Sequence, residues 1–210
     1  MTSGSLQIRI LAVDDHALVR DGIAGLVGVQ PDMVMVGEAS TGREAIQQFR
    51  ALHPDVTLMD LQMPEMNGLD ALIAIRNESP EAKIIVLTTY RGDVQIVRAL
   101  KAGAQAYLLK NTLHKELLET IRAVHAGRKG LSPEASYEIA EHATDDTLTP
   151  AEIAVLRLIA AGSANKQIAD QLSITEETVK SRVKNILSKL GANDRTHAAM
   201  IGLKRGIIEL

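Results

Sequence analysis

Residues 54–70 read PDVTLMDLQMPEMNGLD, and this stretch decides the fold. An apolar run through Val56, Leu58 and Met59 stops at a carboxylate, Asp60, and turn-forming residues then follow up to Gly68. Ligands of open α/β sheets bind at the carboxyl ends of the strands. An acid at the end of an apparently buried strand therefore indicates a site at the edge of a parallel sheet.

Strand-like and helix-like segments alternate five times around this stretch. The strands are expected at 6–13, 33–38, 55–59, 83–88 and 105–109, and the helices at 17–29, 42–52, 69–77, 93–102 and 113–126. Alternation of this kind predicts a parallel sheet with helices on both faces. The expected fold class is therefore α/β, a doubly wound (βα)5 parallel sheet.

Polar residues finish four of these strands. Asp14 and Asp15 follow the first, Asp60 ends the third, Thr88 ends the fourth and Lys110 follows the fifth. Strand ends are often polar simply because the chain turns there, which would explain one or two of these residues. Three carboxylates, a hydroxyl and a lysine at one edge are better explained by convergence on a single site.

The chemistry of such a site follows from its charges. Three crowded carboxylates stay ionised only when a cation neutralises them. Oxygen ligands favour Mg²⁺, which keeps several waters and binds phosphate oxygens. With Mg²⁺, Lys110 and Thr88 beside it, Asp60 could act as a nucleophile and accept a phosphoryl group as an acyl phosphate.

A second domain is expected after a linker. Residues 1–127 form the first domain, residues 128–147 a linker with a short helix beginning at Ser132 and Pro133, and residues 148–210 the second domain. The tail reads as four helices, TPAEIAVLRLIAAG, ANKQIADQL, TEETVKSRVKNILSKL and THAAMIGLKRG. The tight turn SIT joins the second and third of these helices, as in a helix-turn-helix. The tail is therefore expected to be a small all-α domain.

The third tail helix has two different faces. Its core face carries Val179, Val183, Ile186, Leu187 and Leu190, and its outward face carries Ser181, Lys184, Asn185 and Ser188, flanked by Lys180 and Arg182. Lysines can neutralise phosphates while serine and asparagine meet base edges, which suits a helix in the major groove of DNA. A solvated amphipathic helix would show the same pattern.

Composition and charge narrow the function classes. The chain of 210 residues has no cysteine, which fits a reducing compartment such as the cytoplasm. Its N-terminus shows no signal peptide or membrane span, so no membrane partner is expected. Residues 1–127 carry 12 Lys/Arg and 15 Asp/Glu, whereas residues 148–210 carry 9 and 6. A basic tail behind an acidic front is typical of a regulatory domain joined to a nucleic-acid binder.

The motifs DDH at 14–16, MDLQMPEMNG at 59–68, VLTT at 86–89 and YLLK at 107–110 resemble the receiver domain of two-component response regulators, a flavodoxin-like domain. The resemblance implies that Asp60 accepts phosphate from a histidine kinase. It implies that Asp14, Asp15, Asp60 and the backbone carbonyl of Gln62 hold Mg²⁺. It also implies that Lys110 and Thr88 bind the phosphoryl oxygens, and that Thr88 and Tyr107 form the switch.

Two further positions, Asn111 and Tyr90, are compared with the receiver family. Asn111 follows Lys110, where many receivers have proline after a cis peptide, so the geometry of this bond is left open. Tyr90 occupies a position that tunes phosphate lifetime in receivers, and we expect it to shield the phosphoryl group from water.

Residues 148–210 are similar to the LuxR-type helix-turn-helix, so the whole chain resembles the NarL/FixJ family. By position, Lys180, Ser181 and Lys184 would face bases or nearby phosphates. Asn165, Lys166 and Thr178 would hold the DNA backbone. Arg182 stands where the family often has histidine and would add a phosphate contact, and Ala151 stands where arginine is frequent. The fourth tail helix, with 198–203, resembles the dimer-forming helix of this domain.

The expected function is therefore a transcription regulator whose phosphorylation at Asp60 promotes dimerisation and promoter binding. Its expected partners are a histidine kinase, double-stranded promoter DNA and, as a further candidate, RNA polymerase. It would hydrolyse its own phosphoryl group slowly and would not be an enzyme acting on external substrates. A phosphatase of the haloacid dehalogenase type is disfavoured because such enzymes need a second aspartate where this chain has Gln62.

Two further alternatives concern the control of the regulator. A LuxR-type regulator that senses a small molecule would have a larger and more aromatic front domain, whereas this chain has a single Phe and no Trp. A regulator that works without phosphorylation is disfavoured by the complete acidic pocket.

Overall fold

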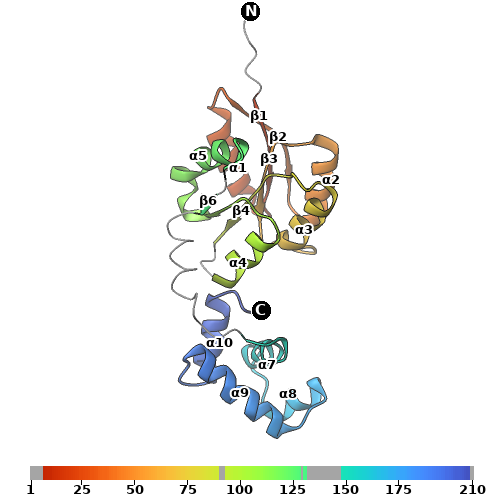
Figure 1. Cartoon of the computed structure of the whole chain (residues 1–210), viewed down its shortest axis with the longest axis vertical. Helices are drawn as coiled ribbons and strands as arrows, with labels where there is room; N and C mark the ends of the chain where they lie inside the picture. The colour runs from red at the N-terminus through yellow and green to blue at the C-terminus, as the bar shows by residue number, and fades with distance from the viewer. Residues whose placement is uncertain (1–6, 90–92, 129, 132–147, 209–210) are drawn as a thin grey trace, which may run out of the picture. The chain divides into compact units, whose positions relative to one another are not determined.

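The computed structural model describes residues 7–89, 93–128, 130–131 and 148–208 (Figure 1). The chain divides into two compact units, and each has its own fold. The first unit is an α/β sheet with its helices, and the second is a group of four helices.

The sheet of the first unit is parallel throughout. Its strands are β1 (Ile8–Val13), β2 (Met33–Ala39), β3 (Val56–Asp60), β4 (Ile84–Thr88), β5 (Ala106–Leu109) and β6 (Gly130–Leu131). They lie in the order β2-β1-β3-β4-β5-β6. The first five confirm the predicted (βα)5 sheet, and the buried apolar runs of β3 and β4 explain why these strands occupy its centre.

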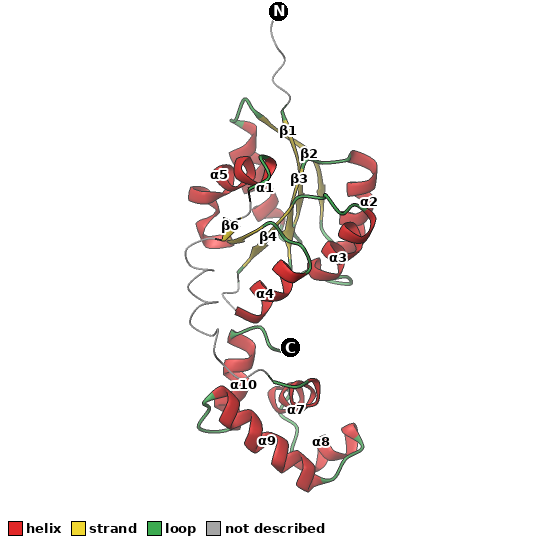
Figure 2. Ribbon diagram, viewed as in Figure 1, coloured by secondary structure: helices red, strands yellow, loops and turns green. Residues whose placement is uncertain are grey.

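Helices cover both faces of this sheet. They are α1 (Ala17–Gly28), α2 (Gly42–Leu52), α3 (Gly68–Glu78), α4 (Asp93–Lys101), the 3₁₀ turn η1 (Lys110–Thr112) and α5 (Leu113–His125). Helices α1 and α5 lie on one side of the sheet, and α2 and α3 on the other (Figure 2). On the α1/α5 face, Ile23 and Leu117 pack with Ile10, Leu58 and Leu87 of the strands.

The sixth strand was missed by the sequence analysis, which placed Gly130 in a linker. In the structure, Gly130 pairs with Ala106 and Leu131 with Tyr107, both in parallel register with β5. A two-residue strand is too short to show any hydrophobic alternation, so no pattern could reveal it. The short helix predicted from Ser132 lies outside the described residues.

The second unit confirms the predicted four-helix domain. It contains α7 (Pro150–Ala160), α8 (Asn165–Leu172), α9 (Glu176–Leu190) and α10 (Arg195–Lys204). Buried apolar residues from all four helices form its core, namely Val155, Leu156, Ile159, Ile168, Ala169, Val179, Ile186, Ala198 and Ala199. Throughout the described ranges, no helix has the length and apolar character needed to span a membrane.

A capping box fixes the start of α7. The Thr149 side chain accepts a hydrogen bond from the Glu152 backbone, and Glu152 Oε2 accepts one from the Thr149 backbone N–H at 2.8 Å. Lys189 Nζ of α9 lies 2.9 Å from the same carboxylate. Burial raises the pKa of Glu152, but the bonds from Thr149 and Lys189 outweigh it, so the pKa is lowered overall. This carboxylate therefore ties α7 to α9.

A buried hydroxyl in β3 offers a direct test of the core. Thr57 is fully buried, and its Oγ1 has no hydrogen-bond partner among the described residues. We expect Thr57→Val to raise the free energy of unfolding by about 1 kcal/mol, because it removes an unsatisfied polar group while keeping the shape. Urea unfolding measures this change. Val56→Thr is the matched control, because it adds a hydroxyl at a neighbouring buried position and should destabilise. Equal destabilisation by both variants would contradict the prediction.

Candidate functional site

The predicted acidic residues meet at one edge of the sheet. Asp14 follows β1, Asp60 ends β3, Thr88 ends β4 and Lys110 follows β5. Because these strands are parallel and adjacent, their carboxyl ends lie side by side. Asp14 and Thr88 are fully buried, and Asp60 is 2% exposed. The parallel register thus brings together residues that are far apart in the sequence.

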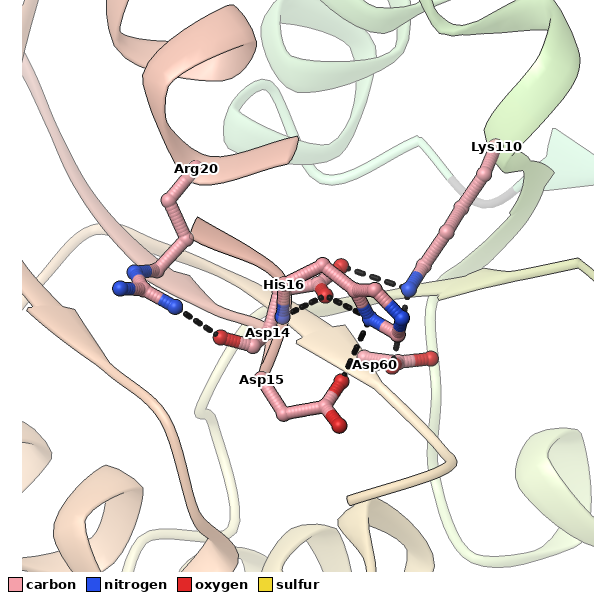
Figure 3. Close-up of polar contacts among 6 residues, drawn as sticks. All are labelled: Asp14, Asp15, His16, Arg20, Asp60 and Lys110. Atoms are coloured by element: carbon pink, nitrogen blue, oxygen red, sulfur yellow. Dashed lines mark hydrogen bonds and ion pairs between the residues drawn. The ribbon is translucent and has the colours of Figure 1, made fainter. Parts of the chain in front are cut away.

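Lys110 is the centre of this site. Its Nζ lies 2.7 Å from Asp14 Oδ2 and 2.9 Å from Asp60 Oδ2 (Figure 3). The pKa of Asp60 is raised overall, because burial and the charge of Asp14 raise it by more than Lys110 and the Gln62 backbone N–H lower it. Burial also lowers the pKa of Lys110, but Asp14 and Asp60 outweigh this effect and raise it overall. The ammonium therefore stays charged and neutralises part of the carboxylate pair.

Asp15 and His16 complete a group of side chains that could hold a metal ion. His16 Nδ1 lies 2.7 Å from Asp15 Oδ1 and 3.3 Å from Asp14 Oδ1, and the His16 backbone N–H donates to Asp14 Oδ1 at 2.9 Å. One donor atom from each of Asp14, Asp15, His16 and Asp60 lies within 4.8 Å of the others. This acidic cluster could hold a metal ion, and its carboxylate oxygens fit a hard cation such as Mg²⁺.

His16 was given no role in the sequence analysis. The signal was present, because His16 directly follows the two aspartates. Sequence spacing alone, however, does not show whether the ring turns back toward those carboxylates or out into solvent.

The loop between β3 and α3 is packed tightly against Asp60. A Cβ on Gly68 would lie 1.8 Å from the Asp60 carbonyl oxygen, and the Gly68 N–H donates to Leu61 O at 3.0 Å. The backbone N–H of Gln62 donates to the Asp60 carboxylate and lowers its pKa. The structure thus places Gln62 beside Asp60. The metal role expected of its carbonyl stays a prediction.

The two predicted switch residues contact each other. Tyr107 lies in β5, is fully buried and forms a hydrogen bond with Thr88 at the end of β4. Burial raises the pKa of the Tyr107 hydroxyl, so Tyr107 is neutral at ordinary pH. Tyr90 lies outside the described residues. No peptide bond in the described part of the chain is cis, and this includes the bond between Lys110 and Asn111.

The second candidate site is the outward surface of α8 and α9. Val179 and Ile186 are buried, which confirms the predicted core face of α9. Of the residues predicted to contact DNA, four are exposed and three are half-buried. The exposed residues are Lys166, Lys180, Ser181 and Lys184, and the half-buried ones are Asn165, Thr178 and Arg182.

Two of these residues have local partners at the start of α9. The Thr178 hydroxyl lies 2.8 Å from that of Thr175, which caps the helix by accepting the Thr178 N–H at 3.1 Å. Lys180 Nζ lies 3.4 Å from Glu177 Oε2. Thr178 therefore helps to form the helix start, a function that the sequence analysis did not foresee for it.

Helix α10 was expected to form a dimer. Ala198 and Ala199 are buried in the core of their own unit, whereas Met200 is 65% exposed. Of these three residues, only Met200 could contribute to a surface that meets a second copy.

Two stretches of the chain match known protein families. The response regulator receiver domain family matches residues 10–122, and the luxR family of bacterial regulatory proteins matches residues 146–201. The chain belongs to the response regulators. The combination of these two domains makes it a response regulator of the NarL/FixJ type.

Relatives and solved structures support this placement. The response regulator protein VraR of Staphylococcus aureus strain Mu3 is 37% identical over 209 residues, which covers 97% of this chain and all of VraR. The response regulator ChrA of a heme-sensing two-component system is 32% identical, with a TM-score of 0.58 over 96% of this chain and 99% of ChrA. A complex of the response regulator RcsB with DNA is 25% identical, with a TM-score of 0.71 over 93% of this chain and 97% of RcsB.

A substitution at Gly68 tests how closely the loop between β3 and α3 of this response regulator is packed against Asp60. We expect Gly68→Ala to destabilise the receiver unit by ~3 kcal/mol, because the added methyl group collides with backbone and the loop must move. Urea unfolding measures the change. Gly25→Ala is the control. Gly25 lies inside α1 with no atom within 4 Å of an added Cβ, so this variant should stabilise by ~1 kcal/mol. A neutral Gly68→Ala would contradict the close contact.

Proposed function

We propose that this response regulator accepts a phosphoryl group on Asp60 from a histidine kinase and then binds promoter DNA as a dimer. One observation carries this proposal: Lys110 Nζ bridges Asp14 and Asp60 at 2.7 and 2.9 Å in a buried pocket. The matches to the receiver and luxR families support the proposal, and so does the structure of RcsB dimers bound to DNA. The proposed location is the cytoplasm, where a histidine kinase domain and DNA are both accessible.

The acidic site would transfer the phosphoryl group as follows. A carboxylate oxygen of Asp60 attacks phosphorus, so that the new O–P bond forms as the N–P bond of a phosphohistidine breaks. Asp14, Asp15, Asp60 and the Gln62 carbonyl would hold Mg²⁺, which neutralises charge on the phosphoryl oxygens when bound. Lys110 would exchange its contact with Asp60 for a phosphoryl oxygen. The protein later hydrolyses this phosphate slowly and is proposed to act on no external substrate.

The bond between Thr88 and Tyr107 would carry the signal out of the pocket. A phosphoryl group on Asp60 offers the Thr88 hydroxyl a charged acceptor, and hydrogen bonds to charged groups are roughly twice as strong as neutral ones. Thr88 would then leave Tyr107 and alter the surface near β5. This change would favour the dimer.

Helix α9 would enter the major groove of the DNA. Lys180, Ser181 and Lys184 are exposed on its outward side, and Arg182 would add a phosphate contact. Asn165 and Lys166 of α8 would hold the DNA backbone, together with Thr178. RNA polymerase is proposed as a further partner at the promoter.

Beryllofluoride tests the phosphorylation step. With Mg²⁺ and this phosphoryl mimic, we expect the full chain to change from monomer to dimer and to bind DNA at least about tenfold more tightly, a gain of ~1.4 kcal/mol. Light scattering and fluorescence anisotropy measure the two effects. Asp60→Asn should abolish both. Asp21→Asn, which changes an exposed acid on α1, is the control and should behave as the wild type. If beryllofluoride changes neither the oligomeric state nor the DNA affinity of the wild type, the protein is not regulated by phosphorylation of Asp60.

Lys184 tests the DNA interface. With a random duplex of about 30 base pairs as the probe, we expect Lys184→Ala to weaken binding and to reduce the slope of log K against log salt by about 0.9, the value for one lost phosphate contact. Anisotropy titrations at several salt concentrations measure this slope. Lys204→Ala is the matched control, because Lys204 is an exposed lysine at the end of α10 and not on α8 or α9, the helices predicted to contact DNA. An equal loss in both variants would rule out α9 as the recognition helix.

A further inference from the structure

The backbone carbonyl of Asp14 is held by a side chain that has no role in the proposed chemistry. Arg20, in the first turn of α1, donates from one terminal nitrogen to Asp14 O at 2.6 Å. The Arg20 side chain is 19% exposed, and Asp14 is fully buried. A charged donor makes a shorter and stronger hydrogen bond to a carbonyl than a neutral donor does. Figure 3 shows Arg20 reaching Asp14 from the side opposite Lys110.

This bond fixes the orientation of the peptide group between Asp14 and Asp15. The Asp14 carbonyl belongs to the peptide that joins Asp14 to Asp15, and a peptide group is planar. Holding its oxygen therefore sets the direction in which the chain carries Asp15. On the other side of Asp14, its N–H donates to Ala39 O at 3.0 Å, which continues the pairing with β2. The turn is thus fixed at both of its backbone ends.

A second bond holds the guanidinium itself. Arg20 Nε donates to Glu38 Oε2 at 3.1 Å, and Glu38 lies near the end of β2. The Glu38 carboxylate has two effects. It orients the Arg20 guanidinium toward the Asp14 carbonyl. It also offsets the positive charge of Arg20, which would otherwise repel a cation from the nearby carboxylates. Arg20 can therefore brace the acidic site without opposing metal binding.

We propose that Arg20 is a positioning residue for the metal site, with Glu38 as its partner. This inference rests on the proposed function, in which Asp14 and Asp15 hold Mg²⁺. The ion demands near-ideal octahedral geometry, so its affinity depends on how the two carboxylates are aimed. Arg20 aims them through the backbone and does not touch the metal. Outer-shell partners of this kind change metal affinity by tenfold or more when they are removed.

Calorimetric titration of the full chain with MgCl₂ tests the inference. We expect Arg20→Gln to raise the Mg²⁺ dissociation constant about tenfold, while its metal-free melting temperature stays within a few degrees of the wild type. Arg20→Lys keeps a charged donor for one of the two partners and should recover part of the affinity. Glu38→Gln still accepts a hydrogen bond but loses its charge, so it should weaken Mg²⁺ binding less, and this effect should shrink at high salt.

The controls separate the possible failures. Arg43→Gln removes an exposed arginine of α2 and should bind Mg²⁺ as the wild type does. If Arg20→Gln also binds Mg²⁺ normally, the positioning role is wrong while the proposed function stands. If the wild type binds no Mg²⁺, the proposed function fails and the inference fails with it. Should Arg20→Gln not fold, unchanged Mg²⁺ affinity in both Arg20→Lys and Glu38→Gln overturns the inference.

Discussion

Two buried carboxylates can remain charged side by side only when a cation lies between them. In this protein that cation is the ammonium of Lys110, which contacts Asp14 and Asp60 at once. Without it, the buried pair would repel and one acid would hold a proton. An aspartate with a proton is a poor nucleophile. The same ammonium that keeps the resting site stable would therefore also keep Asp60 ready for phosphoryl transfer.

This pairing depends on the sheet. Lys110 follows β5 and Asp60 ends β3, with β4 between them. Their side chains meet only because parallel register aligns the ends of three successive strands, with Asp60 opposite Leu87 and Thr88 opposite Leu109. A slip of one residue in any strand would turn its polar end residue to the other face. The apolar interiors of the strands, by fixing register, also fix the geometry of the site.

The sequence was informative where a pattern is long or a residue type is unusual. Alternating strands and helices predicted the parallel sheet, and the polar residue at each strand end predicted which side chains would meet. The hydrogen bonds of the backbone were not predictable in this way. The bond from the Gln62 N–H to Asp60, and that from Arg20 to the Asp14 carbonyl, depend on how loops close in three dimensions. Strand β6 was not predicted because it has only two residues, which is too short to show any periodicity.

The contact between Thr88 and Tyr107 suggests how a phosphoryl group on Asp60 could alter the protein surface near β5. Thr88 has a single hydroxyl proton, so if it donates this proton to Tyr107 it cannot donate it to a phosphoryl oxygen at the same time. Tyr107 is fully buried, and a buried polar group that loses its partner costs about 1–3 kcal/mol. If Thr88 turned toward a phosphoryl group, the Tyr107 hydroxyl would lose this hydrogen bond. The free energy of one displaced hydrogen bond is comparable to the coupling energies found between allosteric sites. Burial of Tyr107 would therefore make the proposed switch responsive, because an exposed tyrosine would replace its lost bond with water.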